Sequence, residues 1–165
     1  MFTNFYMRIY LDNCCYNRPF DDQNQLSVRL ETEAKLRIQY LMRLGIVEYV
    51  WSKVLDYELG QSPFFDDEGK IADWSDWAVV YVDVNPQITA RGAEIMRHKV
   101  KRMDALHLAC ALAAGCDWFL TTDRGILKKF QNWVPCGLQI PWTSSWRKDS
   151  GCDANDRCGT KGDML

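Results

Sequence analysis

The chain has 165 residues, of which 47% are hydrophobic and 25% are charged, and its formal net charge at pH 7 is -2. These values are typical of one globular domain, and they exclude disorder over most of the length and a strongly basic nucleic-acid-binding protein. Any polyanion partner must therefore be held by a local basic patch or by bound cations.

The cysteines and the apolar segments bear on the compartment. The seven cysteines lack the paired spacing of a disulfide scaffold or a zinc ribbon, which favours a reducing environment. Residues 1–10 are too short and too polar for a signal sequence, and no stretch approaches the roughly 18 apolar residues of a membrane span. We expect a soluble protein of the cytoplasm that has no membrane partner.

The first elements alternate in type. Residues 7–11 (MRIYL) are a β-rich run, and the turn-forming stretch 12–22 after it predicts a loop. Residues 24–44 predict an amphipathic helix that Gly45 ends. The apolar residues at helical spacing in this segment are Leu26, Leu30, Leu36, Ile38 and Leu41.

The middle of the chain continues this alternation. Residues 46–51 alternate like a strand, and Ser52 can cap a short helix through Leu59. Residues 66–76 predict another helix, and residues 78–84 (AVVYVDV) are the clearest strand in the chain. The apolar residues expected on the buried side of the 66–76 helix are Ile71 and Trp74.

The last elements include a helix of unusual composition. Asn85, followed by a proline, opens a helix, and a basic link over 97–102 leads into residues 103–114, which are apolar nearly all round and predict a buried helix. Residues 117–122 (DWFLTT) predict a strand, and a last helix begins over 124–130.

Strands that alternate with helices indicate an α/β fold, a three-layer α/β/α sandwich around a mainly parallel sheet. We expect this domain to span residues 1–142. Residues 143–165 are rich in Ser, Gly, Asp and Lys, and we expect a flexible polar C-terminal tail there.

Two aspartates stand where strands end. Asp12 follows RIYL, and Asp123 follows WFLTT. In an open α/β sheet ligands bind beyond the carboxyl ends of the strands, so these carboxylates can converge on one site. Each on its own is equally well read as an ordinary loop aspartate, because Asp is common in turns.

Two further acids join them. Asp104 opens the apolar helix, where an unpaired buried carboxylate would be costly, unless it only favours the helix N-terminus from a solvated position. Glu58 lies three and four residues beyond Leu55 and Val54, on their inward side, although a surface position near a helix end is the plain alternative. Four hard oxygen donors suit Mg²⁺ or Mn²⁺ and disfavour zinc.

Three segments of the chain resemble PIN-domain nucleases: YLDNCCYNRPFDD (10–22), VLDYELG (54–60) and RMDALHLACALAAGCDWFLTTD (102–123). The agreement spans most of residues 7–130, and it is weak after about Asn132. The resemblance implies a metal-dependent endoribonuclease that cuts single-stranded RNA and leaves the phosphate on the 5' side of the new end. It also implies a homodimer and, since similar bacterial proteins are frequently toxins, an antitoxin partner.

Mapped onto this chain, the resemblance puts the catalytic and metal-binding positions at Asp12, Glu58, Asp104 and Asp123. Asn13 and Thr122 stand beside them as hydrogen-bonding support for the substrate. The residues read from the sequence as phosphate contacts are Lys101 and Arg102 in the basic link, and Arg18 and Arg124 near proposed ligands. A solvated link between helices is the plain reading of the basic run.

Other functions remain open at this point. An inactive PIN-fold module that binds RNA or a protein is the main alternative, and a phosphoacceptor α/β domain is weakened because the first strand lacks a DxDxT arrangement. A metal-free mechanism would need both histidines, His98 and His107, in one pocket, whereas His107 fits a satisfied core residue. Cys14 and Cys15 fit packing better than thiol chemistry.

Overall fold

The computed structural model describes residues 7–61 and 72–130. Its sheet has the strand order β3-β2-β1-β4, and every neighbouring pair is parallel. In the register, Ile9 pairs with Tyr49 on one side and with Trp118 on the other. The strands are β1 (Met7–Leu11), β2 (Val47–Ser52), β3 (Val80–Val82) and β4 (Trp118–Leu120).

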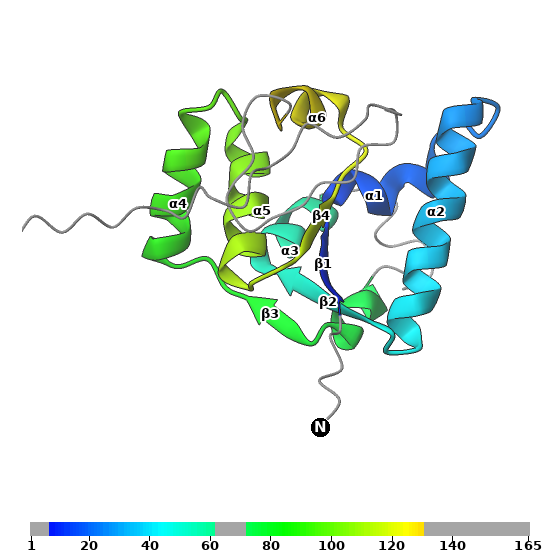
Figure 1. Ribbon diagram of the computed structural model, residues 1–165, viewed down its shortest axis with the longest axis horizontal. Helices are drawn as coiled ribbons and strands as arrows, with labels where there is room; N and C mark the ends of the chain where they lie inside the picture. Colours follow the sequence, from blue (N-terminus) through cyan, green and yellow to red (C-terminus); the bar gives the residue numbers. More distant parts are fainter. Residues whose placement is uncertain (1–6, 62–71, 131–165) are drawn as a thin grey trace, which may run out of the picture.

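Helices cover both faces of this sheet. Figure 1 shows α2 (Leu26–Arg43) on one side of the strands and α4 (Pro86–Met96) and α5 (Arg102–Ala113) on the other. Both α2 and α5 contact β2, and α4 packs on α5. The predicted three-layer α/β/α sandwich with a parallel sheet is therefore confirmed. In the described ranges, no helix has the length and apolar character that crossing a membrane requires.

The predicted helix boundaries follow from local chemistry. The Ser52 hydroxyl accepts a hydrogen bond from the Leu55 N–H at the start of α3 (Lys53–Leu59), as its position predicts. Gly45 and Gly115 adopt φ angles of 66° and 64° just beyond α2 and α5, a conformation that a side chain disfavours. The predicted burial of α5 is also confirmed, since six of its twelve residues are buried.

The loop predicted over residues 12–22 is wrong. Residues Asn13–Asn17 form a short helix, α1, and Arg18–Phe20 form a 3₁₀ turn, η1. The Asp12 carboxylate accepts a hydrogen bond from the Asn13 N–H, and Cys15 and Tyr16 are buried in the core. Capping and burial therefore stabilise a helix in a stretch whose Asn and Pro residues indicate turns.

Two other predictions are modified. The helix expected over 66–76 lies partly outside the described residues, together with Ile71, and its described part is a 3₁₀ helix, η2 (Ala72–Trp77), in which Trp74 is half-buried. The strand expected over 78–84 is confirmed but shorter, as β3. The last helix is confirmed as α6 (Arg124–Phe130). The proposed tail and the boundary at residue 142 lie outside the described residues.

The buried face of α2 differs from the prediction. Leu26, Leu30 and Leu36, which the apolar pattern places toward the core, are at least half exposed. The fully buried positions are instead Val28, Thr32, Gln39 and Met42. The helix therefore turns a partly polar face inward and an apolar one outward.

Replacing Asn85 tests the capping of α4. Its side-chain oxygen accepts from the Ile88 N–H at 2.9 Å, directly before Pro86. We expect Asn85→Ala to lower the free energy of unfolding by about 1 kcal/mol, measured by urea denaturation, because one helical N–H loses its partner. Asn85→Asp keeps the acceptor and should remain close to wild type. Equal stability of all three proteins would contradict this assignment.

Candidate active site at the carboxyl edge of the sheet

The strand order reverses between β1 and β4. From β1 the chain crosses first to β2 and β3 on one side, and it returns to pair β4 on the other side of β1. Ligands of open α/β sheets bind at the carboxyl ends of strands where the order reverses in this way. Asp12 directly follows β1, and Asp123 lies three residues beyond β4. The fold therefore brings these two acids to one edge.

Hydrogen-bond donors just beyond the ends of β1 and β4 hold the Asp12 side chain. It is 5% exposed, and its Oδ2 accepts hydrogen bonds from the Thr121 hydroxyl at 2.7 Å and from the Cys14 thiol at 3.2 Å. Its Oδ1 accepts from the Asn13 N–H at 2.8 Å. Burial raises the pKa of the Asp12 carboxyl well above its ordinary value, because the charged form loses hydration.

Glu58 is held by a buried histidine. The Oε2 of Glu58 lies 2.7 Å from the Nε2 of His107, and the same nitrogen lies 4.0 Å from Oδ1 of Asp12. A carboxylate only accepts hydrogen bonds, so Nε2 carries the proton and donates to Glu58. His107 is 1% exposed, and its ring therefore places one N–H between two carboxylates.

A chain of polar groups fixes the other side of that ring. The Tyr10 hydroxyl lies 2.7 Å from Nδ1 of His107 and 2.6 Å from the hydroxyl of Ser52, and all three side chains are buried. Ser52 also caps α3, the helix that carries Glu58. The ring orientation of His107 and the position of Glu58 are thus linked through one network that joins β1, β2, α3 and α5.

Asp104 completes the group. It lies in the first turn of α5 and is half-buried. Burial raises the pKa of its carboxyl, the negative charges of Asp123 and Glu58 raise it further, and Lys101 and His107 lower it. Asp12, Glu58 and Asp104 therefore lie near His107, and Asp123 is close enough to Asp104 to act on its carboxyl.

The donors present fit a hard divalent cation by their chemistry. All four are carboxylates, the ligand type of Mg²⁺ and Mn²⁺, and a cation would offset the mutual repulsion that Asp104 experiences. Within the described ranges, no three acidic, histidine or cysteine side chains are arranged closely enough to form a ready coordination sphere. The oxygens of Asp12 and Oδ1 of Asp123 are engaged instead with hydrogen-bond donors, in the latter case the Gly125 and Ile126 N–H groups.

The residues proposed for substrate contact fall into two groups. Lys101, Arg102 and Arg124 are exposed at the starts of α5 and α6, and Lys101 is close enough to act on Asp104. Arg18 is instead paired with Asp21 and Glu31, each at 2.9 Å.

The small polar residues proposed for substrate contact lie closer to Asp12. Asn13 starts α1, and its side-chain oxygen accepts from the Asn17 amide at 3.4 Å. The buried hydroxyl of Thr122 has no hydrogen-bond partner among the described residues, which leaves a polar atom next to the acids available to a ligand.

Two residues of the site escaped the sequence reasoning. His107 fits the expected satisfied core histidine in its burial and in its contact with Tyr10, but its other partner is the proposed ligand Glu58. Thr121 also connects the site, since its hydroxyl donates to Asp12 and accepts from the Asp123 N–H at 3.1 Å. The position of Thr121 at a strand end, close to Asp123, is the sequence feature that could have indicated its role. No feature of the sequence indicates that His107 bonds to Glu58.

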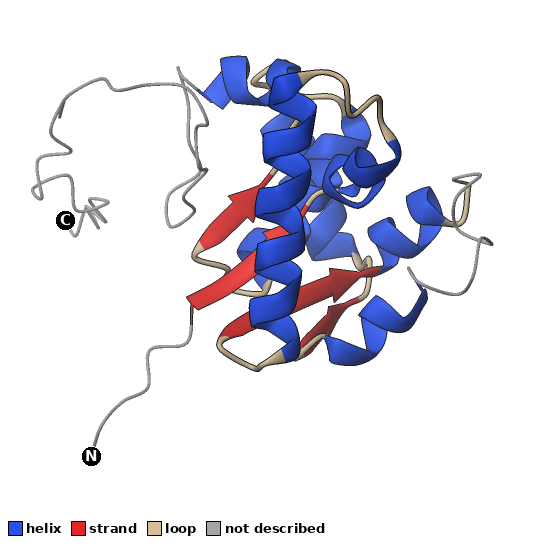
Figure 2. Cartoon of the chain, turned by 90° about the vertical axis from the view of Figure 1, so that its right-hand side faces the viewer, coloured by secondary structure: helices blue, strands red, loops and turns tan. Residues whose placement is uncertain are grey.

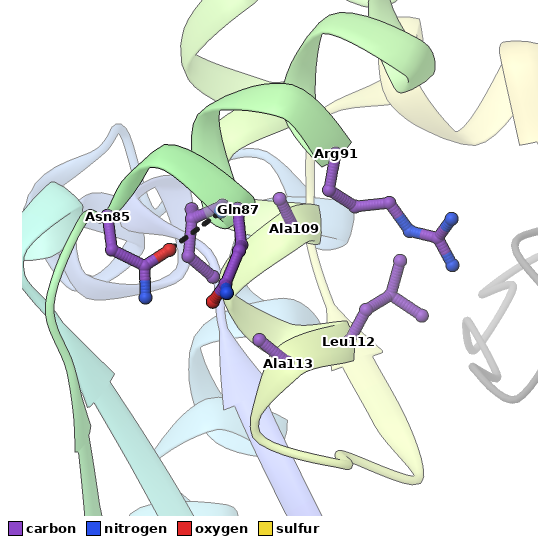
Figure 3. Close-up of a pocket in the computed structure, with 7 residues that line it drawn as sticks. Asn85, Gln87, Arg91, Ala109, Leu112 and Ala113 are labelled. Carbon is purple, nitrogen blue, oxygen red and sulfur yellow. Dashed lines mark hydrogen bonds between the residues drawn. The ribbon is translucent and has the colours of Figure 1, made fainter.

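A separate hollow lies between α4 and α5 (Figure 3). It encloses about 290 Å³. Asn85, Gln87 and Arg91 line it from the α4 side, and Ala109, Leu112 and Ala113 line it from α5. None of the four acids lines this pocket, so it is distinct from the candidate site.

Comparison with known proteins gives a match to a family model and matches to solved structures. The family model of the PIN domain matches residues 66–131, a range that includes Asp104 and Asp123. No curated protein matches the chain. Among solved structures, the crystal structure of VapBC2 from Rickettsia felis, bound to a DNA fragment from their promoter, is similar with 15% identity and a TM-score of 0.48. That similarity covers 81% of this chain and 98% of the other.

Thr121→Val tests the linkage between Asp12 and β4. The change keeps the shape of the side chain but removes the hydroxyl, so the buried Asp12 carboxylate loses a donor and the Asp123 N–H loses an acceptor. We expect the free energy of unfolding to fall by about 1–3 kcal/mol in urea denaturation. Thr121→Ser retains the hydroxyl and should lose clearly less; a Ser variant as unstable as the Val variant would show that packing, not hydrogen bonding, is the cause.

Proposed function

We propose that this chain is a divalent-metal-dependent endoribonuclease that hydrolyses phosphodiester bonds of single-stranded RNA. The match of residues 66–131 to the PIN-domain model agrees with the resemblance drawn from the sequence. The observation that carries the proposal lies where the strand order reverses: Asp12, Glu58 and Asp104 are near His107, and Asp123 is close enough to act on Asp104. The family match includes only Asp104 and Asp123. Asp12 and Glu58 lie outside the matched residues and belong to the first half of the chain.

The metal that we assign is Mg²⁺ or Mn²⁺, held by Asp12, Glu58, Asp104 and Asp123. When bound, such an ion supplies a more acidic water as nucleophile and positive charge beside the attacked phosphate. The chain's own part is to hold the carboxylates in place. Asp12 is rigid because Thr121 and Asn13 donate to it, and Glu58 is oriented by His107.

RNA binding is assigned to the exposed cations and the small polar groups around the acids. Lys101, Arg102 and Arg124 are placed to contact phosphates, and the free hydroxyl of Thr122 and the amide of Asn13 can bond to the substrate. We retain Arg18 only as a secondary contact, because Asp21 and Glu31 already neutralise it.

We extend the proposal to the biological setting. Similar PIN-domain proteins are frequently bacterial toxins, so we assign this chain to the cytoplasm, as a homodimer and as the toxin of a toxin–antitoxin pair. A small upstream reading frame with a DNA-binding pattern would support the antitoxin, and its absence would favour a stand-alone nuclease.

Asp104→Asn and Asp123→Asn test the proposed activity. Both changes remove a negative charge with almost no change in shape. We expect each to lower the cleavage rate of a labelled RNA with single-stranded loops by about 100-fold or more in the presence of Mn²⁺, because a charged ligand is lost. Wild type should also lose its activity when a chelator is added and regain it with excess Mn²⁺.

Asp83→Asn is the matched control. Asp83 is exposed just beyond β3, at the other side of the same sheet, and its replacement makes the same change in charge. Circular dichroism should show the same fold for all the variants. Equal cutting by wild type and by the Asp104 and Asp123 variants would identify a contaminant. Absence of cutting by the wild type would favour the inactive RNA-binding or protein-interaction module.

His107 should act as a positioning residue for Glu58. We expect His107→Leu, which removes the donor but fills the buried space, to weaken both Mn²⁺ binding and cleavage by about 10- to 100-fold. His107→Gln keeps an N–H group that can donate to Glu58, and it should restore most of both. Mn²⁺ binding is measured directly by isothermal titration calorimetry, and stability by thermal unfolding. A Leu variant that binds Mn²⁺ as tightly as wild type would reduce His107 to a structural role.

A further inference from the structure

The outward side of α2 carries an apolar stripe. Four large side chains along it are at least half exposed: Leu26 at 61%, Leu30 at 55%, Tyr40 at 50% and Leu44 at 53%. Glu33 and Arg37, also exposed, lie between them. With 100° of rotation per residue, these six positions fall within a narrow sector of the helix. We call them the outer stripe of α2: Leu26, Leu30, Glu33, Arg37, Tyr40 and Leu44.

Among the described residues, no other helix or strand covers this stripe. Figure 2 shows α2 in front of the strands along its whole length, with its outer side toward the viewer. Its opposite side contacts η1 and β2, where Thr32 bonds to the Arg18 carbonyl and Lys35 lies over the rings of Tyr16 and Trp74. Large exposed apolar side chains gathered on one face of a protein mark interaction sites.

The order of residues along the stripe is symmetric. Counted from Lys35, Glu33 and Arg37 are each two positions away, Leu30 and Tyr40 five, and Leu26 and Leu44 nine. When two copies of α2 run antiparallel about a two-fold axis that crosses the outer stripe at the level of Lys35, apolar residues face apolar residues. Glu33 of each copy then faces Arg37 of the other, so the charges are complementary as well. A two-fold interface requires this self-complementarity.

We infer that the outer stripe of α2 is a homodimer interface in which two copies of α2 pack antiparallel. This inference does not depend on the proposed nuclease activity, because none of the four acids belongs to the stripe. Arg37 lies 5.2 Å from the ring centroid of Tyr40 in its own chain, so its guanidinium packs on another residue of the stripe.

The expected dimer is weak. α2 has 18 residues, so a pair of helices of about 27 Å in length forms the contact. One helix face from each copy reaches only the lower end of the area found in specific interfaces. We therefore expect a dimer that dissociates at concentrations on the order of micromolar.

A charge swap tests the antiparallel arrangement directly. In sedimentation velocity over a concentration series, Glu33→Lys or Arg37→Glu alone should raise the dimer dissociation constant by about tenfold or more, since like charges then face each other across the axis. The double variant Glu33→Lys with Arg37→Glu restores opposite charges and should return the constant to within about threefold of wild type. Leu30→Glu, which places a charge opposite Tyr40, should give a monomer.

Arg91→Glu on α4 is the matched control. Arg91 also forms an exposed charge pair within its helix, with Glu94 at 3.0 Å, but it lies off the stripe, so its replacement should leave the dimer unchanged. The outcomes that overturn the inference are a wild-type chain that stays monomeric at all concentrations, a dimer that the single variants do not weaken, and a double variant that stays monomeric. Cleavage assays on the same samples keep failure of the dimer separate from failure of the nuclease proposal.

Discussion

The buried carboxylate of Asp12 is the constraint on which the site depends. A carboxylate that is almost without solvent must be surrounded by donors, and here the donors come from the start of α1 and the end of β4. The Asp12 N–H also bonds to the Leu120 carbonyl at 2.9 Å, so backbone and side chain both tie β1 to β4. Asp12 therefore connects β1 to β4 where the strand order reverses, and Thr121, which bonds to it, also holds the Asp123 N–H.

The same requirement extends into the core through His107. Helix α5 is apolar over most of its surface, and packing alone would allow it to slide or rotate against the sheet. Hydrogen bonds run from Ser52 through Tyr10 to His107 and on to Glu58. A shift of α5 would break these bonds and leave buried polar atoms unpaired. The network thus fixes the register of α5 against β1 and β2, and it sets the distance of Asp104 from Glu58.

The sequence predicts features that depend on neighbouring residues in the chain. It fails for features that depend on contacts with residues far away in the chain. Strands and helices were recognisable by period, and Asp12 and Asp123 were recognisable because parallel strands end at one edge. The sequence predicts a loop after Asp12, because Asn and Pro residues there are typical of turns. The helix that forms instead is stabilised by the Asp12 cap and by burial of Tyr16, and the burial does not show in the local sequence. The sequence predicts that the apolar face of α2 points inward, but the structure exposes it. Helical spacing shows that apolar residues share one face, and it does not show whether the core of the same chain covers that face. The role of His107 depends on Glu58, which is 49 residues away in the chain.

The placement of the four acids explains how the chain tolerates them together. Asp12 precedes α1, Asp104 lies in the first turn of α5, and Asp123 precedes α6, so three of the four stand at helix N-termini, where the backbone N–H groups favour negative charge. Glu58 is the exception, because it lies one residue before the end of α3, at the unfavourable pole. It is also the acid to which His107 donates. The buried imidazole therefore supplies to Glu58 the electrostatic support that helix N-termini supply to the other three, which gives a reason for a histidine among the buried apolar residues of α5.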